Sequence, residues 1–359
     1  MKNYDVIIIG GGAIGSSIAY SLSKRNKRVA IIEKQMIGSG ASSAAAGLLG
    51  VQAEWDAEDP LFHLAQQSRR LFPKLQEEIR TLSGIDIGYE QKGILRIAHT
   101  EQELARIHDI MNWQSACGEV CEQMTMAQVQ QIEPAVSSKL YGGVFCRDDG
   151  HVLAKDLTKG YAASAAALGC DIYEHTEVTQ IIEQQGEVCG VQTTAGMLEA
   201  KQIILATGAA NQPLQQCFEI EAIPVKGEVV CLHSYEPILQ VPLFRERFYI
   251  APKRGGHYVI GATMKRGDVT KHVEAASVQH LLNQAFELVP ALQQATFKTS
   301  WAGLRPDCSL ERPLMAQHAT TKGLWCAVGH YRNGILLSAI TGEYMANQLE
   351  EVTDACNYV

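Results

Sequence analysis

Three glycines near the start of the chain have the spacing of a phosphate-binding turn. Gly10, Gly12 and Gly15 follow the apolar run 6–9 and precede a stretch with helical spacing of apolar residues. Glycines at this spacing allow a tight bend and a close approach of backbone to a pyrophosphate, whose charge the helix amides stabilise. Glu33 follows the next apolar run, 18 positions after Gly15, where a carboxylate can accept hydrogen bonds from both ribose hydroxyls. The pattern therefore predicts a dinucleotide site.

A run of small residues follows that acid. Residues 38–47 read Gly-Ser-Gly-Ala-Ser-Ser-Ala-Ala-Ala-Gly. The run is either the closely packed start of a helix or a loop that lies along an extended cofactor toward a flavin ring. Residues 203–208 form another apolar strand with a Thr-Gly turn, and no second G-x-G-x-x-G turn occurs. Because a flavoenzyme reduced by NAD(P)H normally needs two dinucleotide sites, we expect an organic substrate to reduce the flavin.

The elements that position this turn alternate between strand and helix. Residues 6–9 and 29–32 are short apolar runs typical of strands buried on both faces, and 14–24 between them predicts a helix, so we expect a right-handed β-α-β unit. Gly255 and Gly256 predict a hairpin turn. Further helices are expected at 59–82, 100–116, 125–132, 155–168, 273–288 and 334–349, and further strands at 85–98, 171–173, 188–194, 202–206, 225–232, 247–252, 257–263 and 324–328.

The order of these elements predicts an α/β fold with two interleaved domains. A Rossmann-like FAD-binding domain is expected to be discontinuous and to comprise 1–85, 145–222 and 300–359. An antiparallel-sheet substrate-binding domain is expected to comprise 86–144 and 223–299. A length of 359 residues is consistent with two domains.

Composition and charge exclude several classes of protein. The chain is 46% hydrophobic and 19% charged, which is typical of a globular protein, and its net charge of −8 with no basic block argues against a nucleic-acid partner. The ten cysteines are scattered without a C-x-x-C pair, no apolar run reaches membrane-spanning length, and no leader pattern is evident. We expect a cytoplasmic protein with free, buried thiols and no membrane contact. His63, His108 and His175 have no partner at metal-ligand spacing, so no metal is expected.

Several motifs, in order along nearly the whole chain, resemble those of the D-amino-acid-oxidase superfamily of FAD enzymes. They are the glycine turn with Glu33, Ser-Ser-Ala-Ala-Ala-Gly at 42–47, Ala-Thr-Gly at 206–208, Trp-Ala-Gly-Leu-Arg-Pro at 301–306 and Gly-His-Tyr-Arg-Asn-Gly-Ile-Leu-Leu at 329–337. The resemblance implies a tightly held FAD and the oxidation of a small amine.

The resemblance also implies contacts with the cofactor, position by position. Ser300 and Trp301 stand where covalently flavinylated relatives carry a Cys, so the FAD is expected to be non-covalent. The residues expected to contact it are Gly10, Gly12, Ala13, Ile14, Gly15, Glu33, Lys34, Ala41, Ser42, Ala46, Gly47, Leu48, Val178, His330, Tyr331, Arg332, Asn333, Gly334, Ile335 and Leu336.

The same resemblance implies that Arg305, Arg332 and Tyr249 contact the substrate. An amino acid presents a carboxylate, and a guanidinium binds it with two parallel hydrogen bonds. Each residue also has a structural alternative: a buried ion pair for Arg305, a place in the core for Tyr249, and a carboxylate elsewhere for Arg332. The chain departs from the family pattern at Leu48, where relatives have Met, and at Arg247, where they have His, which leaves the fine substrate preference open.

We therefore expect an FAD-dependent amine oxidase that needs no general base, because a neutral amine can give up its Cα hydrogen as a hydride to flavin N5. The resemblance is strongest to members that convert glycine to an imine, which hydrolyses to glyoxylate and ammonia, while molecular oxygen becomes hydrogen peroxide. It also implies a role in the thiazole branch of thiamine biosynthesis and a homotetramer. The alternatives are a sarcosine oxidase, a D-amino-acid oxidase or dehydrogenase, and a non-catalytic flavin-binding subunit of a larger complex.

Overall fold

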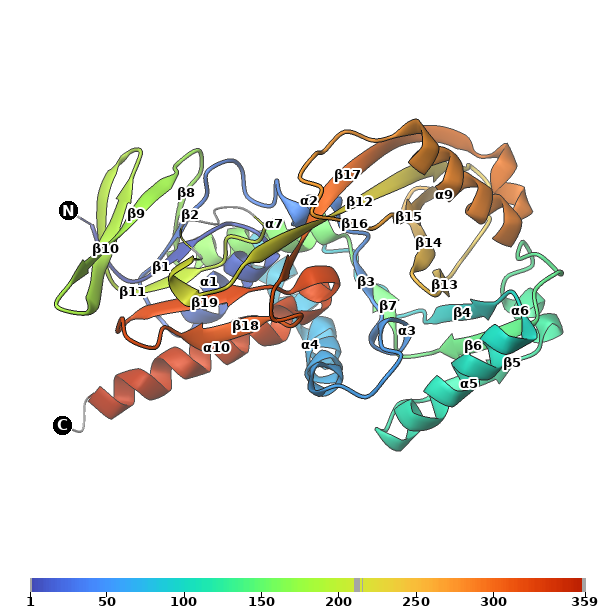
Figure 1. Ribbon diagram of the computed structural model, residues 1–359, viewed down its shortest axis with the longest axis horizontal. Coiled ribbons are helices and arrows are strands. Elements are labelled where there is room, and N and C mark those ends of the chain that lie inside the picture. Colours follow the sequence, from blue (N-terminus) through green and yellow to red (C-terminus); the bar gives the residue numbers. More distant parts are fainter. Residues whose placement is uncertain (1, 210–213, 215, 357–359) are drawn as a thin grey trace.

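The computed structural model describes residues 2–209, 214 and 216–356, and most of its strands belong to two large sheets (Figure 1). The first sheet has eight strands, of which the run from β19 to β8 is parallel. In spatial order they are β18 (Leu314–Gln317), β19 (Leu324–Val328), β11 (Gly196–Leu205), β1 (Asn3–Ile9), β2 (Val29–Ile32) and β8 (Asp171–Tyr173). In addition, β10 (Glu187–Thr193) pairs antiparallel with β11, and β9 (Val178–Gln184) pairs antiparallel with β10.

The second sheet has nine strands and is antiparallel except where β4 pairs with β13. In spatial order they are β16 (Lys265–Arg266), β12 (Ala222–His233), β15 (His257–Gly261), β14 (Phe248–Lys253), β13 (Leu243–Arg245), β4 (Ile94–Ala98), β6 (Gly142–Cys146) and β5 (Cys121–Met124), with β17 (Thr296–Cys308) paired to β12. Two short strands, β3 (Leu48–Leu49) and β7 (Gly150–His151), pair separately. The predicted α/β fold with a Rossmann-like part and an antiparallel-sheet part is confirmed.

Helices cover both sheets. The helices α1, α4, α7 and α10 pack on one another against the first sheet, and α9 packs on the second. The helices and short turns are α1 (Ala13–Lys24), α2 (Ala41–Ala44), α3 (Val51–Glu54), α4 (Pro60–Ser83), α5 (Glu101–Ala116), α6 (Met126–Ile132), α7 (Ala154–Ala167), α9 (Ala275–Leu288), α10 (Gly334–Cys356), η1 (Gln216–Phe218), η2 (Pro290–Gln294) and η3 (Tyr331–Asn333).

Strand β1 is buried on both faces, as predicted. Val6 and Ile8 pack among the helices, whereas Ile7 and Ile9 pack on the opposite side with side chains of β9 and β10. Successive side chains of a strand point to opposite faces, so a strand between two cores must be apolar at every position. The parallel pairing of β1 with β2 confirms the predicted β-α-β unit.

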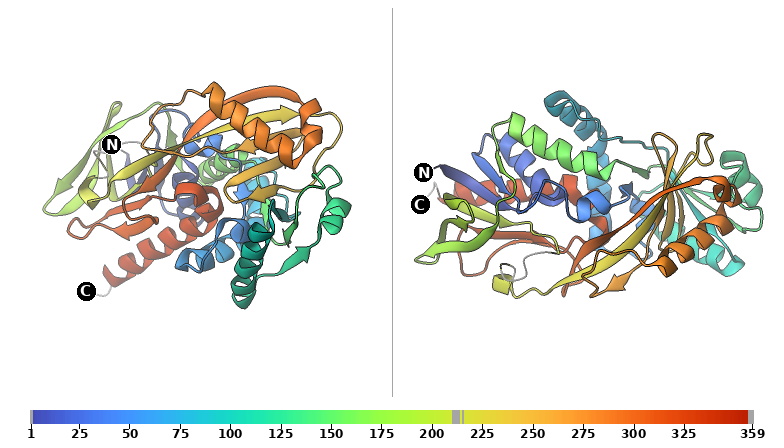
Figure 2. Two further views of the ribbon diagram at one scale, coloured as in Figure 1. Left: turned by 45° about the vertical axis from the view of Figure 1, so that its right-hand side comes forward. Right: turned by 90° about the horizontal axis from the view of Figure 1, so that it is seen from above.

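A long ribbon formed by β12 and β17 joins the two sheets (Figure 2). Val230 and Leu232 of β12 lie in the core of the second sheet, whereas Cys308 at the end of β17 lies in a core of the first. The expected domain boundary at 299–300 falls inside β17, and the one at 144–145 falls inside β6.

The strand predictions differ from the structure in two ways. Of the strand expected at 85–98, only Ile94–Ala98 forms, because Gly88 and Gly93 have φ of +63° and +85° and turn the chain before it. The structure also contains strands that were not expected, among them β5, β6, β9, β13, β17 and β18. The Ala-Gly and Pro within β17 break the apolar alternation that would have indicated a strand.

The cysteines whose side chains the structure describes are free, as predicted, and Cys356 lies outside them. Cys217 is exposed, and Cys117, Cys121 and Cys189 are half-buried, so the prediction that the thiols are buried is wrong for these four. Within the described ranges, no helix combines the length and apolarity needed to cross a membrane.

The helix α4 shows how local sequence signals set its ends. Asp59 Oδ1 accepts a hydrogen bond of 2.7 Å from the amide of Leu61, Pro60 occupies the first turn, and Gly84 ends the helix with φ of +74°. The helix predicted at 59–82 is therefore confirmed within one residue at each end.

We expect Asp59→Ala to lower the free energy of unfolding by about 1 kcal/mol, because it leaves a helix amide without its acceptor. Chemical denaturation of the flavin-loaded protein measures the change. Asp59→Asn is the control, because it keeps a side-chain oxygen at the cap and should recover most of the loss. Equal losses in both variants would contradict a capping role.

Candidate functional site

One cavity of about 910 Å³ is bordered by elements of both sheets. All the residues predicted to contact cofactor or substrate line it, except Gly15 and Leu336. A Cβ on Gly15 would lie 2.0 Å from the carbonyl oxygen of Gly10, so this glycine lets α1 pack on the turn. Leu336 is buried among the helices, where its carbonyl accepts a hydrogen bond of 2.5 Å from Ser68 Oγ.

The glycine turn leaves room for a pyrophosphate at the start of α1. Gly10 has φ of +110°, and a Cβ there would lie 2.5 Å from the carbonyl oxygen of Ala206. Gly12 caps α1 without a side-chain hydrogen bond, and of the described atoms only Ser42 Oγ lies within 4 Å of where its Cβ would be. The amide of Ala13 donates to Ser42 Oγ at 2.9 Å. The turn thus offers open space beside a helix N-terminus, which favours an anion.

Glu33 follows β2 and lines the cavity beside the glycine turn. Its carboxylate accepts hydrogen bonds from the amides of Gly11 at 2.8 Å and Gln35 at 2.9 Å, which fixes its orientation. Lys34 and Val178 line the same wall. A carboxylate in this position can accept hydrogen bonds from ribose hydroxyls and would repel a 2′-phosphate.

The small-residue run forms the wall between the two ends. Ser42 and Ala44 belong to α2, a single helical turn whose residues also line the cavity. The run is thus a closely packed helical turn, as the first interpretation predicted, and it borders the cavity, which the second interpretation requires. Trp301 Nε1 donates to the carbonyl of Ala44 at 3.1 Å, and a Cβ on Gly303 would lie 2.5 Å from Ala44 Cβ. The small residues therefore let β17 approach this wall closely.

Arg305 on β17 lines the part of the cavity that the second sheet borders. Its Nη1 donates to the carbonyl of Thr263 at 3.1 Å, and a Cβ on Gly227 of the neighbouring strand would lie 2.4 Å from Nη1. No carboxylate among the described residues lies within ion-pair distance of this guanidinium. Burial lowers the pKa of Arg305, although nearby Tyr249 acts in the opposite direction. Among the described residues, this half-buried cation thus has no anionic partner.

Tyr249 lies beside Arg305, and burial raises the pKa of its phenol to about 12. A Cβ on Gly261 would lie 2.5 Å from Tyr249 Oη, so the hydroxyl occupies the space above that glycine. Because the phenol stays protonated at any ordinary pH, it can donate a hydrogen bond into the cavity.

Arg332 forms an ion pair with Glu54, and both side chains are 13% exposed. Arg332 therefore has a carboxylate partner, as its structural alternative required. That partner, Glu54, lines the same cavity rather than lying elsewhere. Sequence reasoning missed Glu54. The available signal was an acid in an otherwise apolar stretch, Leu-Leu-Gly-Val-Gln-Ala-Glu-Trp at 48–55.

The remaining wall contains the start of α10. Asn333, Gly334 and Ile335 line the cavity, so the positive end of the helix dipole lies at its wall. Burial lowers the pKa of His330 to about 4, and its Nε2 lies 3.1 Å from Thr341 Oγ1. A neutral His330 thus joins this wall to α10.

The structure corrects the prediction that His63 is isolated. The ligand atoms of Glu58, His63 and Cys117 lie within 4.8 Å of one another near the start of α4. His108 and His175 belong to no such group in the described part of the chain.

Comparisons with known proteins agree with this geometry. Residues 5–348 match the model of the family described as FAD dependent oxidoreductase. A glycine oxidase of Geobacillus kaustophilus is 41% identical over 97% of this chain and 93% of its own length. The crystal structure of a glycine oxidase from Bacillus cereus superposes with a TM-score of 0.94, at 49% identity over 97% of this chain and 95% of that one. A bifunctional protein ThiO/ThiG of Trichormus variabilis is 33% identical, and the match covers 97% of this chain and 53% of that protein.

We expect Gly12→Ala to weaken FAD binding by about tenfold or more, because the added methyl fits the protein but occupies space beside the phosphate site. Titration of flavin-free protein with FAD measures the dissociation constant, and thermal unfolding of the flavin-free protein should be unchanged. Gly10→Ala is the comparison, because its clash with Ala206 should destabilise the flavin-free protein itself. An unchanged FAD affinity in Gly12→Ala would contradict the placement of the phosphate.

Proposed function

The chain belongs to the FAD-dependent oxidoreductase family, and we propose that within it the protein oxidises glycine to an imine, which water converts to glyoxylate and ammonia. The observation that carries the proposal is Arg305, a half-buried cation that has no anionic partner among the described residues and lines the same cavity as the glycine turn. Relatives named glycine oxidase, matched over nearly their full lengths, support it.

The first sheet in this proposal holds the FAD, and the second supplies the substrate residues. The glycine turn and Glu33 would hold the pyrophosphate and the adenosine ribose without a covalent link. Tyr249 and Arg305 stand on β14 and β17 of the second sheet. The FAD, when bound, supplies a two-electron acceptor that takes a hydride from the substrate and passes the electrons to oxygen, which becomes hydrogen peroxide.

Arg305 binds the substrate carboxylate in this proposal. A hydrogen bond to a charged group contributes roughly 1.5–3 kcal/mol, and a carboxylate also neutralises the half-buried guanidinium. The lysines at 34, 155 and 271 and Arg247 also line the cavity, but they are exposed and remain solvated. Tyr249 donates its hydroxyl to the same carboxylate, and together these groups orient the Cα–H bond of the substrate.

Glu54 and Arg332 form the other side of the substrate end. Because their charges cancel, the pair adds polarity to the cavity without competing with Arg305 for the carboxylate. The Glu54 carboxylate can accept a hydrogen bond from the substrate amine. No side chain is required to remove a proton from carbon, because that hydrogen leaves with its electron pair.

The wider context is part of the same proposal. The relative named ThiO/ThiG supports use of the product in the thiazole branch of thiamine biosynthesis. A small amino acid and oxygen are the partners this reaction requires. A homotetramer and a cytoplasmic location complete the proposal.

An anaerobic panel of glycine, sarcosine, D-alanine and D-proline tests the proposed reaction. We expect glycine to bleach the flavin absorbance within the time of turnover, and aerobic assays to yield glyoxylate and hydrogen peroxide in equal amounts. Faster bleaching by sarcosine or a D-amino acid would favour those oxidases instead. Absence of bleaching by every amine would indicate a non-catalytic flavin-binding subunit and contradict the proposal.

We expect Arg305→Ala to raise the KM for glycine by about tenfold or more while FAD stays bound, because the substrate carboxylate loses its cation. Steady-state kinetics and the flavin spectrum measure both. Arg254→Ala is the matched control, because this exposed arginine at the turn after β14 pairs with Asp86 away from the cavity. An unchanged KM in Arg305→Ala would remove this residue from the substrate site.

A further inference from the structure

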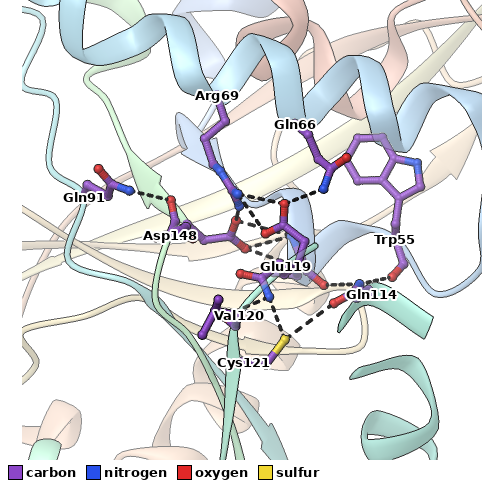
Figure 3. Close-up of polar contacts among 12 residues, drawn as sticks. Trp55, Gln66, Arg69, Gln91, Gln114, Glu119, Val120, Cys121 and Asp148 are labelled. Carbon is purple, nitrogen blue, oxygen red and sulfur yellow. Dashed lines mark hydrogen bonds and ion pairs between the residues drawn. The ribbon is translucent and has the colours of Figure 1, made fainter. Parts of the chain in front are cut away.

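A buried cluster of three charges lies beneath the α3 turn. Arg69 on α4 donates from Nη2 to both oxygens of Glu119, at 2.9 and 2.7 Å (Figure 3). Its Nη1 donates to Asp149 Oδ1 at 2.7 Å. The three side chains are 7%, 1% and 0% exposed, respectively. Two carboxylates therefore share one guanidinium without solvent, and burial raises the pKa of Asp149 to about 6.

Asp149 also binds the backbone of α3. Its Oδ2 accepts hydrogen bonds from the amides of Gln52 at 3.0 Å and Ala53 at 3.1 Å. A helical turn of four residues leaves its first amides without partners in the turn, and here the carboxylate supplies them. The cluster is thus continuous with the turn that carries Glu54.

The carbonyl groups of the turn accept hydrogen bonds from side chains of the second sheet and of α5. Arg96 Nη1 and Gln114 Nε2 both donate to the carbonyl of Gln52, at 2.9 and 3.0 Å. Gln114 Nε2 also donates to the carbonyl of Trp55 at 2.9 Å (Figure 3). Amides and carbonyls of α3 are therefore both fixed by buried side chains.

Of the α3 side chains, Glu54 lines the cavity at the end that holds Arg332 and Arg305. Glu54 pairs with Arg332, and Ala53 packs in a small cluster that Leu48 and Tyr249 contact. A displacement of the turn would move the Glu54 carboxylate and loosen the contact behind Tyr249. Replacing a buried ion cluster by apolar residues is often neutral or stabilising, so global stability alone is a weak reason for this one.

We propose that Asp149 is a positioning residue: held by Arg69, it fixes the amides of Gln52 and Ala53 and thereby sets Glu54 against Arg332 for substrate binding. The inference rests on the proposed oxidation of a small amino acid. Asp149 does not line the cavity, so it acts through Glu54.

The test compares Asp149→Asn with the flavin-loaded wild type. We expect the KM for glycine to rise about tenfold with a smaller change in kcat, because the amide group cannot accept hydrogen bonds from both the turn and Arg69. FAD content and flavin absorbance should be unchanged. A KM within twofold of the wild type would overturn the proposal.

A double-mutant cycle with Glu54→Gln separates positioning from a structural effect. If Asp149 acts through Glu54, Asp149→Asn should change KM by less than about twofold in the Glu54→Gln background. The same tenfold change in both backgrounds would overturn the proposal. Arg69→Lys is a second variant, because an ammonium keeps the charge but not the fork that reaches both carboxylates; it should shift KM in the same direction by a smaller factor.

Glu133→Gln is a matched control for loss of a buried carboxylate. Glu133 is 1% exposed, its Oε1 accepts hydrogen bonds from the amides of Gln240 and Val241 at 2.8 and 2.6 Å, and it does not line the cavity. This variant should lower the unfolding temperature and leave the KM unchanged. A KM increase equal to that of Asp149→Asn would show general loosening and overturn the proposal.

Binding of glycolate, which has a hydroxyl in place of the amine of glycine, separates this inference from the proposed reaction. The change in flavin absorbance on titration gives its dissociation constant without turnover. If the wild type binds glycolate but does not oxidise glycine, the proposed function fails, and a tenfold weaker glycolate affinity in Asp149→Asn still supports positioning. An equal glycolate affinity in variant and wild type would overturn the positioning role.

Discussion

The guanidinium of Arg305 lies against backbone, with a carbonyl as its hydrogen-bond partner and no carboxylate of the described chain beside it. A charge in this setting is costly to bury unless it is paired. The folding of the second sheet places it there: β17 carries the arginine, and Gly227 of β12 makes room for it. The bound carboxylate of an amino acid would supply the missing negative charge. The ion-pair energy that Arg305 lacks in the folded protein would then contribute to substrate binding.

The two ends of the cavity are built by different means. The part beside the glycine turn is formed mostly by backbone, because Gly10 and Gly12 carry no side chains there. The part that holds Arg305 and Arg332 is formed by long polar side chains, which are fixed by pairing and packing. Arg332 forms an ion pair with Glu54, which belongs to the helical turn α3. Asp149 fixes that turn by accepting hydrogen bonds from two of its amides. A flexible side chain is therefore kept in one place by several layers of contacts.

Sequence patterns were sufficient where the structure depends on neighbours along the chain. The strand, helix and acid around Gly10 and Glu33 follow from apolar periodicity and glycine spacing. The ends of α4 follow from an Asp-Pro pair at its start and a glycine after its last turn. Contacts between distant segments left no local pattern. Glu54 meets Arg332 across 278 positions, and Asp149 meets Arg69 across 80. A charged residue in an apolar stretch indicates that a partner exists, but the partner is identified only by the fold. The position of β17 was missed for a related reason, because its small residues serve close packing on α2 rather than a strand pattern.

The ribbon of β12 and β17 has a mechanical consequence. Its strands are paired from Ala222 opposite Cys308 to His233 opposite Thr296, and the two ends belong to different cores. A hinge motion that separated the two sheets would have to break backbone hydrogen bonds between β12 and β17. Each broken hydrogen bond would need a new partner. An amine therefore reaches the cavity through movements of side chains and surface loops, while the ribbon of β12 and β17 stays rigid.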